Sequence, residues 1–122
     1  MNITLSSVII DAADLEPESA FWHRLLGGSL TRTPTHHFVQ APGLPVLVIQ
    51  SAPGHVAPDW PDGNSQQMHL DFAVDDLSTA DRTATEAGAG RLHPTDDAGP
   101  APRKGSRVYS SPAGHPFCLR SA

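Results

Sequence analysis

Residues 69–77 read HLDFAVDDL, and this stretch decides the fold. Apolar and polar side chains alternate through its first part, as they do in a strand with one buried face, and two acidic residues then lead into a helix. A similar stretch, SVIIDAADL, lies 62 residues earlier, at residues 7–15. A repeat at about half of the 122-residue length predicts two similar modules, each of which opens with a strand followed by a helix.

The composition is typical of a soluble globular domain, with 39% hydrophobic and 17% charged residues. The net charge of −5 argues against a nucleic acid or an anionic membrane surface as a partner, since both attract clustered lysine and arginine. Arg103, Lys104 and Arg107 come closest together among the basic residues, and their Pro/Gly-rich surroundings predict a solvated loop. No apolar stretch approaches the roughly 20 residues that a membrane span needs.

The sequence also favours a reducing compartment. A single cysteine, Cys118, has no partner for an internal disulfide, so nothing requires an oxidising environment. The first residues lack the basic region that precedes the apolar core of a signal peptide. We therefore expect a cytoplasmic protein.

The first predicted module has the order strand, helix and three strands. Its opening strand lies at residues 3–10, and its helix begins near Asp14 and ends at Gly27. The buried stripe of this helix consists of Leu15, Trp22, Leu25 and Leu26. The three strands that follow lie at residues 30–33, 36–40 and 46–50.

The second module repeats this order after a linker rich in proline and glycine. Its helix begins near Ser78, which together with Asp81 resembles a capping box. The buried stripe of the helix consists of Leu77, Ala80, Ala84 and Ala87, and the later strands lie at residues 90–92, 107–110 and 117–120. We place the first module at residues 1–52, the linker at 53–66 and the second module at 67–122, as two halves of a single domain with one core.

Three parts of the sequence resemble the vicinal oxygen chelate superfamily, which includes glyoxalase I, bleomycin-resistance proteins and extradiol dioxygenases. They are the first-module opening at residues 12–16, 21–22 and 25–28, the stretch at 69–77, and the turn SPAGHPFCL at 111–119. The chain is most similar to the glyoxalase-like branch. The resemblance implies an α+β fold in which two βαβββ modules form a cupped mixed sheet around a cavity. It also implies a homodimer.

In the metal-dependent members of that superfamily, two ligands come from each module. The matching positions here are Ser7, Gln50, His69 and Cys118. Serine is a poor ligand, and a cysteine replaces the carboxylate, so the set suits neither a hard ion such as Mg²⁺ nor a non-haem iron centre. We expect no cofactor, although a divalent metal such as zinc is conceivable with His69, Cys118 and Gln50 as ligands.

The resemblance therefore leads first to a glyoxalase-like protein that binds a small organic molecule in a central cavity without a complete metal site. Its candidate ligand contacts are Gln50, His69, His37, Trp60 and Cys118, and His69 is the candidate for acid/base catalysis because histidine exchanges protons near neutral pH. A thiol inside an apolar strand is expected to be inert, since burial raises its pKa.

Three alternatives remain open at this point. One is a metal-dependent lyase, isomerase or dioxygenase, and another is a protein that confers resistance by sequestering a drug. If the protein is an enzyme, the resemblance favours a glyoxalase-type lyase or isomerase. In the third alternative, the fold serves as a protein-interaction module whose cavity is filled by side chains.

Overall fold

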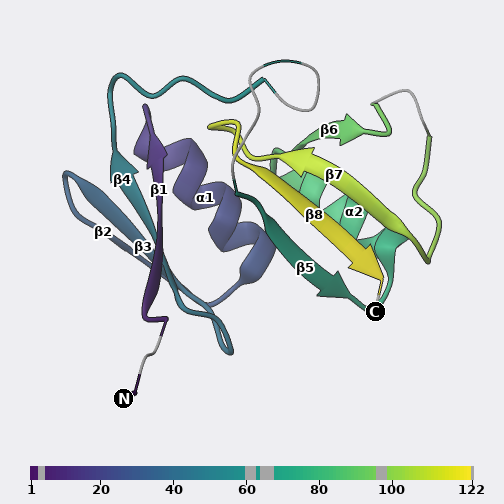
Figure 1. Cartoon of the computed structure of the whole chain (residues 1–122), viewed down its shortest axis with the longest axis horizontal. Helices are drawn as coiled ribbons and strands as arrows, with labels where there is room; N and C mark the ends of the chain where they lie inside the picture. The colour runs from purple at the N-terminus through teal and green to yellow at the C-terminus, as the bar shows by residue number, and fades with distance from the viewer. Residues whose placement is uncertain (3–4, 60–62, 64–67, 96–98, 122) are drawn as a thin grey trace. The chain divides into compact units, whose positions relative to one another are not determined.

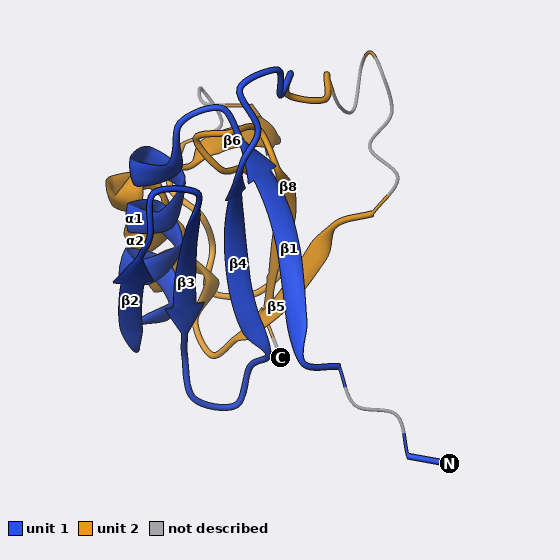
Figure 2. Ribbon diagram, turned by 90° about the vertical axis from the view of Figure 1, so that its left-hand side faces the viewer, with its two compact units in different colours: residues 1–56 blue, residues 57–122 orange. Residues whose placement is uncertain are grey.

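A computed structural model describes residues 1–2, 5–59, 63, 68–95 and 99–121 of the chain. The chain divides into two compact units, module one (residues 1–56) and module two (residues 57–122), which Figure 2 shows in blue and orange. Within the described residues, each module contains one helix and one four-stranded mixed sheet. The predicted plan of two βαβββ modules is therefore confirmed, whereas the arrangement of the two sheets around a cavity stays a prediction.

Module one consists of β1 (Ser7–Ala12), α1 (Leu15–Leu26), β2 (Ser29–Arg32), β3 (His36–Gln40) and β4 (Val46–Ser51) (Figure 1). The strand order is β1-β4-β3-β2, with β1 parallel to β4 and the other neighbours antiparallel. Helix α1 starts after Asp14, whose backbone is extended, and it ends at Gly27, whose φ of 77° favours glycine. Strand β1 starts later than predicted, and residues 3–4 lie outside the described residues.

Helix α1 packs on β2, β3 and β4 and builds the core of module one. Trp22 is 1% exposed and meets Phe21 edge to face at 5.0 Å, so its predicted place in the core is confirmed. The same helix face also buries two polar residues that the sequence did not reveal. The indole nitrogen of Trp22 donates to Glu18 Oε2 at 2.9 Å, and the Ser19 hydroxyl hydrogen-bonds to His37 Nδ1 at 2.6 Å.

Module two consists of β5 (Leu70–Val74), α2 (Leu77–Ala87), β6 (Gly90–His93), β7 (Ser106–Ser110) and β8 (Pro116–Ser121). Its strand order, β5-β8-β7-β6, repeats that of module one, and β5 runs parallel to β8 as β1 does to β4. Asp14 and Asp76 are the N-cap residues of the two helices, as the 62-residue offset predicts. The repeat in the sequence thus corresponds to a repeat in the structure.

The predicted capping box at the start of α2 is wrong. Asp76, and not Ser78, caps the helix: its carboxylate accepts hydrogen bonds from the backbone N–H groups of Ser78 and Thr79. A short acidic side chain directly before the first turn reaches these N–H groups without help from a later residue. Asp81 is therefore not needed at the helix start, and its carboxylate points into the module instead.

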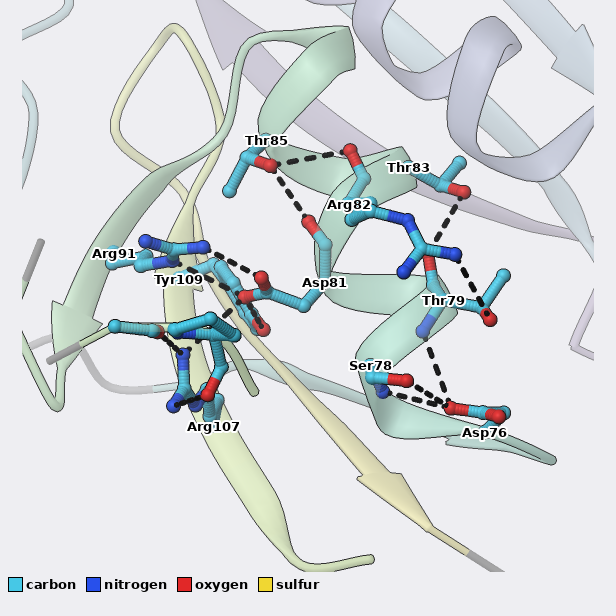
Figure 3. Close-up of polar contacts among 12 residues, drawn as sticks. Asp76, Ser78, Thr79, Asp81, Arg82, Thr83, Thr85, Arg91, Arg107 and Tyr109 are labelled. Carbon is cyan, nitrogen blue, oxygen red and sulfur yellow. Dashed lines mark hydrogen bonds and ion pairs between the residues drawn. The ribbon is translucent and has the colours of Figure 1, made fainter. Parts of the chain in front are cut away.

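Asp81 is the centre of a buried polar network between α2, β6 and β7 (Figure 3). Arg91 binds its two carboxylate oxygens at 3.2 and 2.6 Å, and the Tyr109 hydroxyl donates to Oδ1 at 2.7 Å. Arg107 lies 3.7 Å from the same oxygen and also donates to the carbonyls of Gly99 and Pro100. Arg107 is only 6% exposed, so the prediction that it belongs to a solvated loop is wrong.

This network predicts a loss of stability in acid. Burial by itself would raise the pKa of Asp81, but hydrogen bonds from Arg91 and Tyr109 and the nearby guanidinium charges outweigh it and lower that pKa. The stabilisation is therefore complete above the ordinary aspartate pKa of about 3.9 and is lost as the pH falls through the lowered value. We expect the midpoint temperature of thermal unfolding to decrease when the pH is lowered below about 4. In Asp81→Asn, calorimetric scans should show a smaller decrease over the same pH range. If the unfolding temperature of the variant decreased in acid as much as that of the wild type, other carboxylates would be responsible for the loss of stability.

A second prediction concerns the folding unit. In module one, Ile9, Phe38 and Val48 share the sheet face that points away from α1, because they are register partners and His37, beside Phe38, points to the helix. A fragment of residues 1–58 cannot cover this face with its own helix, and about 60 residues is marginal for independent stability. We expect the fragment to be unfolded or aggregated in circular dichroism and light scattering. A cooperative thermal transition in the fragment would contradict this.

Among the described residues, no helix is long and apolar enough to cross a membrane.

Candidate functional site

Strand alternation in module two separates a face covered by α2 from a face that points away from it. Tyr109 contacts Asp81 of α2 and stacks on Phe117 at 5.4 Å, so both aromatic rings lie on the α2 side. Neighbouring side chains along a strand point to opposite faces. Cys118 therefore points away from α2, together with Asp71, its register partner on β5.

Four polar side chains meet on this face, and we call them the polar cluster of module two. The cluster consists of His69, Asp71, Cys118 and Arg120. His69 Nε2 lies 3.4 Å from Asp71 Oδ1, and Arg120 Nη2 lies 3.3 Å from Asp71 Oδ2. The ligand atoms of His69, Asp71 and Cys118 all lie within 4.8 Å of one another. Asp71 is thus the acceptor that connects an imidazole, a guanidinium and a thiol.

The thiol of Cys118 is held in its protonated form. Burial, followed by a hydrogen bond to Asp71 and the charge of that carboxylate, raises the pKa of Cys118 to about 11. The predicted rise of the thiol pKa is therefore present, and the neighbouring carboxylate of Asp71 contributes to it besides burial. In the absence of a metal, Cys118 acts as a hydrogen-bond donor on this face.

Sequence reasoning missed Asp71 and Arg120. Both follow from the period of a strand, because Asp71 is two residues after His69 and Arg120 is two residues after Cys118. Asp71 also supplies a carboxylate next to Cys118. The resemblance to the superfamily had indicated that Cys118 replaces the carboxylate at this place. Asp71 lies within residues 69–77, and its position two residues after His69 could have identified it as a neighbour on the same face.

In module one, Gln50 lies near the end of β4 and donates to Asp11 Oδ1 at 3.3 Å. Its register partners are Asp11 on β1 and His36 on β3. Ser7, by contrast, pairs with Val46, four residues back along β4, which corresponds to about 13 Å. Ser7 and Gln50 therefore do not form a ligand pair within module one, and the neighbours of Gln50 are Asp11 and His36.

His37 lies on the side of module one that packs against α1. It is 6% exposed, it hydrogen-bonds to Ser19, and its Nδ1 lies 3.8 Å from Glu16 Oε2. His36, on the opposite face, stacks on Phe38 and accompanies Gln50. The placement of His37 does not favour its predicted contact with a ligand.

Two further site predictions stay open. Trp60 lies outside the described residues. Gln50 belongs to module one, whereas His69 and Cys118 belong to module two, so the convergence of Gln50 with that pair also stays a prediction. Within module two, the structure does bring His69 and Cys118 together, as predicted for the site.

The donor atoms of the polar cluster fit a borderline-soft divalent ion. Zinc accepts imidazole, carboxylate and thiolate ligands, commonly with three protein ligands and one open position. Mg²⁺ and Ca²⁺ require mostly oxygen ligands, which a set with one carboxylate does not provide. His69, Asp71 and Cys118 are therefore the residues that could hold such an ion.

The model of one protein family, described as the glyoxalase-like domain, matches residues 7–120. The chain belongs to this glyoxalase-like family. No curated protein matches the chain significantly. Membership agrees with the two βαβββ modules, and it confirms the resemblance seen in the sequence.

Solved structures of the same fold support this placement of the glyoxalase-like chain. A glyoxalase/bleomycin resistance protein/dioxygenase family enzyme from Burkholderia phytofirmans PsJN is 18% identical, with a TM-score of 0.72 and 98% of each chain covered. The fosfomycin resistance protein FosX from Listeria monocytogenes is 16% identical, with a TM-score of 0.70, 100% of this chain covered and 95% of FosX. Oxidase ChaP-H2 is 18% identical, with a TM-score of 0.69 and coverages of 100% and 95%.

Proposed function

We propose that this glyoxalase-like protein binds a small organic molecule on the polar cluster of module two. The observation that carries the proposal is the meeting of His69, Asp71, Cys118 and Arg120 on the sheet face that points away from α2. Small-molecule sites typically combine an apolar lining with a few convergent polar groups. Phe72 and Phe117 stabilise the strands from the α2 side, so the cluster sits on a packed support.

The exposed N–H donors of the cluster favour a ligand with an oxygen-rich or anionic group. The side chains of His69 and Arg120 are 35% and 64% exposed, and both present N–H donors. Arginine binds carboxylate and phosphate groups particularly well, because its planar guanidinium donates two parallel hydrogen bonds. Asp71 orients both donors, and His69 is the residue that exchanges a proton if the protein is an enzyme.

Gln50 is the contact that we propose from module one. Its amide donates to Asp11, and its carbonyl oxygen remains an acceptor for a ligand hydroxyl or amide. His36 is the register partner of Gln50 and stacks on Phe38. This end of the sheet therefore combines aromatic rings with a polar amide.

Replacing His69 by alanine tests the proposal. We expect an affinity for the ligand that is about five- to tenfold weaker, since a buried or partly buried hydrogen bond to a ligand typically contributes about 1 to 1.5 kcal/mol. Native mass spectrometry of the full chain, purified without added ligand, identifies a co-purifying molecule, and titration calorimetry then compares the variants. His55→Ala, in the segment after β4, is the matched control and should bind normally. Equal affinities in wild type and His69→Ala would contradict the proposal.

A drug-sequestering role is one form of this function. Two of the similar structures belong to proteins described as a glyoxalase/bleomycin resistance protein/dioxygenase family enzyme and a fosfomycin resistance protein. Fosfomycin and bleomycin are therefore the first probes for the calorimetric experiment. Protection of cells from either drug that requires His69 would support sequestration or modification of that drug.

A metal-dependent lyase, isomerase or dioxygenase is the second candidate function. The observation that favours it is the carboxylate of Asp71, which accompanies an imidazole and a thiol within 4.8 Å. A bound divalent ion held by His69, Asp71 and Cys118 would supply Lewis-acid activation of a ligand oxygen, while Arg120 would still position the ligand. The metal content of the purified chain separates this candidate from a metal-free binder.

A further inference from the structure

We propose that the ligand of this protein is a small organic acid whose carboxylate or phosphonate group is bound by Arg120, Ser106 and Lys104 of module two. We call these three residues the anion subsite. The inference rests on the proposed function and deepens it, because it assigns the charged end of the ligand to a place beside the polar cluster. Ser106 and Lys104 are new to the site, and neither belongs to the polar cluster.

The register of β7 and β8 places Ser106 next to Arg120. The two residues are partners on these antiparallel strands, so their side chains share the sheet face that points away from α2. The Cβ atoms of such partners lie about 4.5 to 5.5 Å apart. One small anion can therefore accept hydrogen bonds from the Ser106 hydroxyl and from the Arg120 guanidinium at the same time.

The side chains on either side of Arg120 are short. Ala73 of β5 is its register partner on one side and Ser106 of β7 on the other, and both are exposed. The guanidinium extends beyond both of these neighbours, and the Arg120 side chain is 64% exposed. An anion can reach the guanidinium without displacing a large side chain.

Arg120 also has donors that the protein does not use. Its Nη2 lies 3.3 Å from Asp71 Oδ2, and the Arg120 side chain makes no further ion pair or hydrogen bond within the described part of the chain. A guanidinium carries five N–H groups in a planar fork that matches a carboxylate or phosphonate. The contact with Asp71 thus orients Arg120 and leaves most of its donors for a ligand.

Lys104 brings a second cation to this end of the sheet. Gly105, which follows it, donates to Ser121 Oγ at 2.8 Å and accepts from the Ser121 N–H at 2.9 Å, so this turn is tied to the residue after Arg120. Lys104 is exposed, and no carboxylate among the described residues pairs with it, whereas the neighbouring Arg103 pairs with Asp76 at 3.2 Å. An unpaired ammonium group on a flexible stem attracts an anion to this place.

Asp71 determines the orientation of the ligand. Asp71 and Cys118 form the next row of register partners, about 7 Å along the strands from the row that contains Arg120. The Asp71 carboxylate repels a second anion, so the charged group of the ligand lies on the Ser106 side of Arg120. The uncharged polar part of the same molecule then extends towards His69.

The test uses two small anions of different chemistry, propionate and methylphosphonate, as separate probes. Each is titrated into the ¹⁵N-labelled full chain, and propionamide, which has nearly the shape of propionate but no charge, is the control. We expect saturable shift changes at the amides of residues 104–107 and 119–121 with at least one anion, and none with propionamide. The anion that binds more tightly identifies the acid group of the ligand.

Variants assign the binding to the anion subsite. Arg120→Gln should weaken binding of the anion about tenfold, because hydrogen bonds between charged groups are the strong ones. Arg120→Lys keeps the charge without the planar fork and should have a smaller effect. Ser106→Ala, which leaves the contact between Arg120 and Asp71 in place, should weaken binding about threefold. Arg82→Gln removes an exposed arginine from α2 and is the matched control, with unchanged binding.

Three results would overturn the proposal: no saturable binding of either anion, equal binding of propionate and propionamide, or anion affinities in Arg120→Gln and Ser106→Ala that equal that of the wild type. The amide spectra themselves show whether each variant is folded. The proposed function is tested separately by His69→Ala. An uncharged organic molecule whose binding requires His69, together with failure of the anion subsite, would leave the proposed function intact and refute only this inference.

Discussion

Replacing Asp81 by asparagine is expected to lower the free energy of unfolding by about 3 to 5 kcal/mol, the usual cost of removing one partner from a buried ion pair. The substitution keeps the shape of the side chain but removes the charge that Arg91 and Arg107 share. Those side chains are only 19% and 7% exposed. Without the carboxylate, their guanidinium charges would be left largely buried and without a negative partner. Urea denaturation at neutral pH measures the change.

Glu86→Gln is the control for Asp81→Asn. Glu86 lies on the same helix but is exposed, so its neutralisation should change the unfolding free energy by no more than about 0.5 kcal/mol. Tyr109→Phe should have an intermediate effect, because it removes one hydrogen bond to Asp81 and leaves the arginine pairs in place. Similar losses in Asp81→Asn and Glu86→Gln would show that the buried network does not stabilise module two.

Replacing Trp22 by alanine is expected to cost about 3 to 5 kcal/mol of stability. Trp22 is 1% exposed and belongs to α1, the helix that packs on β2, β3 and β4 of module one. The substitution leaves a large cavity and also removes the indole donor at 2.9 Å from the buried Glu18. Chemical denaturation followed by circular dichroism, rather than by tryptophan fluorescence, measures the loss.

Arg24→Ala is the matched control on α1. Arg24 is exposed two residues further along, so its truncation should change stability by no more than about 0.5 kcal/mol. Trp22→Phe should cost less than Trp22→Ala, because a ring still fills most of the space. If Trp22→Ala proved as stable as Arg24→Ala, the core of module one would have to lie elsewhere.

The fold could be predicted because the internal repeat and the hydrophobic periods of strands and helices are recognisable in the amino-acid sequence itself. Asp14 and Asp76 mark equivalent helix starts, and the structure places them so. The interior polar groups could not be predicted. Glu18, Ser19 and Asp81 are buried because partners distant in the sequence satisfy them, and hydrophobic patterning assigns such residues to the surface.

Only part of the candidate site was predicted from the sequence. His69 and Cys118 were identified from the resemblance, and the period of a strand adds Asp71 and Arg120 to them. His37 shows the limit of this reasoning. Alternation indicates that His36 and His37 point to opposite faces, but only the packing of α1, through Ser19, decides which of the two faces the helix.

The central claim is that an organic ligand binds at the polar cluster of module two, and amide NMR tests it most directly. The full chain, labelled with ¹⁵N, is titrated with the molecule that co-purifies or, failing that, with fosfomycin and small carboxylates. We expect the largest shift changes at residues 69–73 and 118–120, and their loss in His69→Ala. Shift changes confined to α2, or changes that persist unaltered in His69→Ala, would contradict the claim.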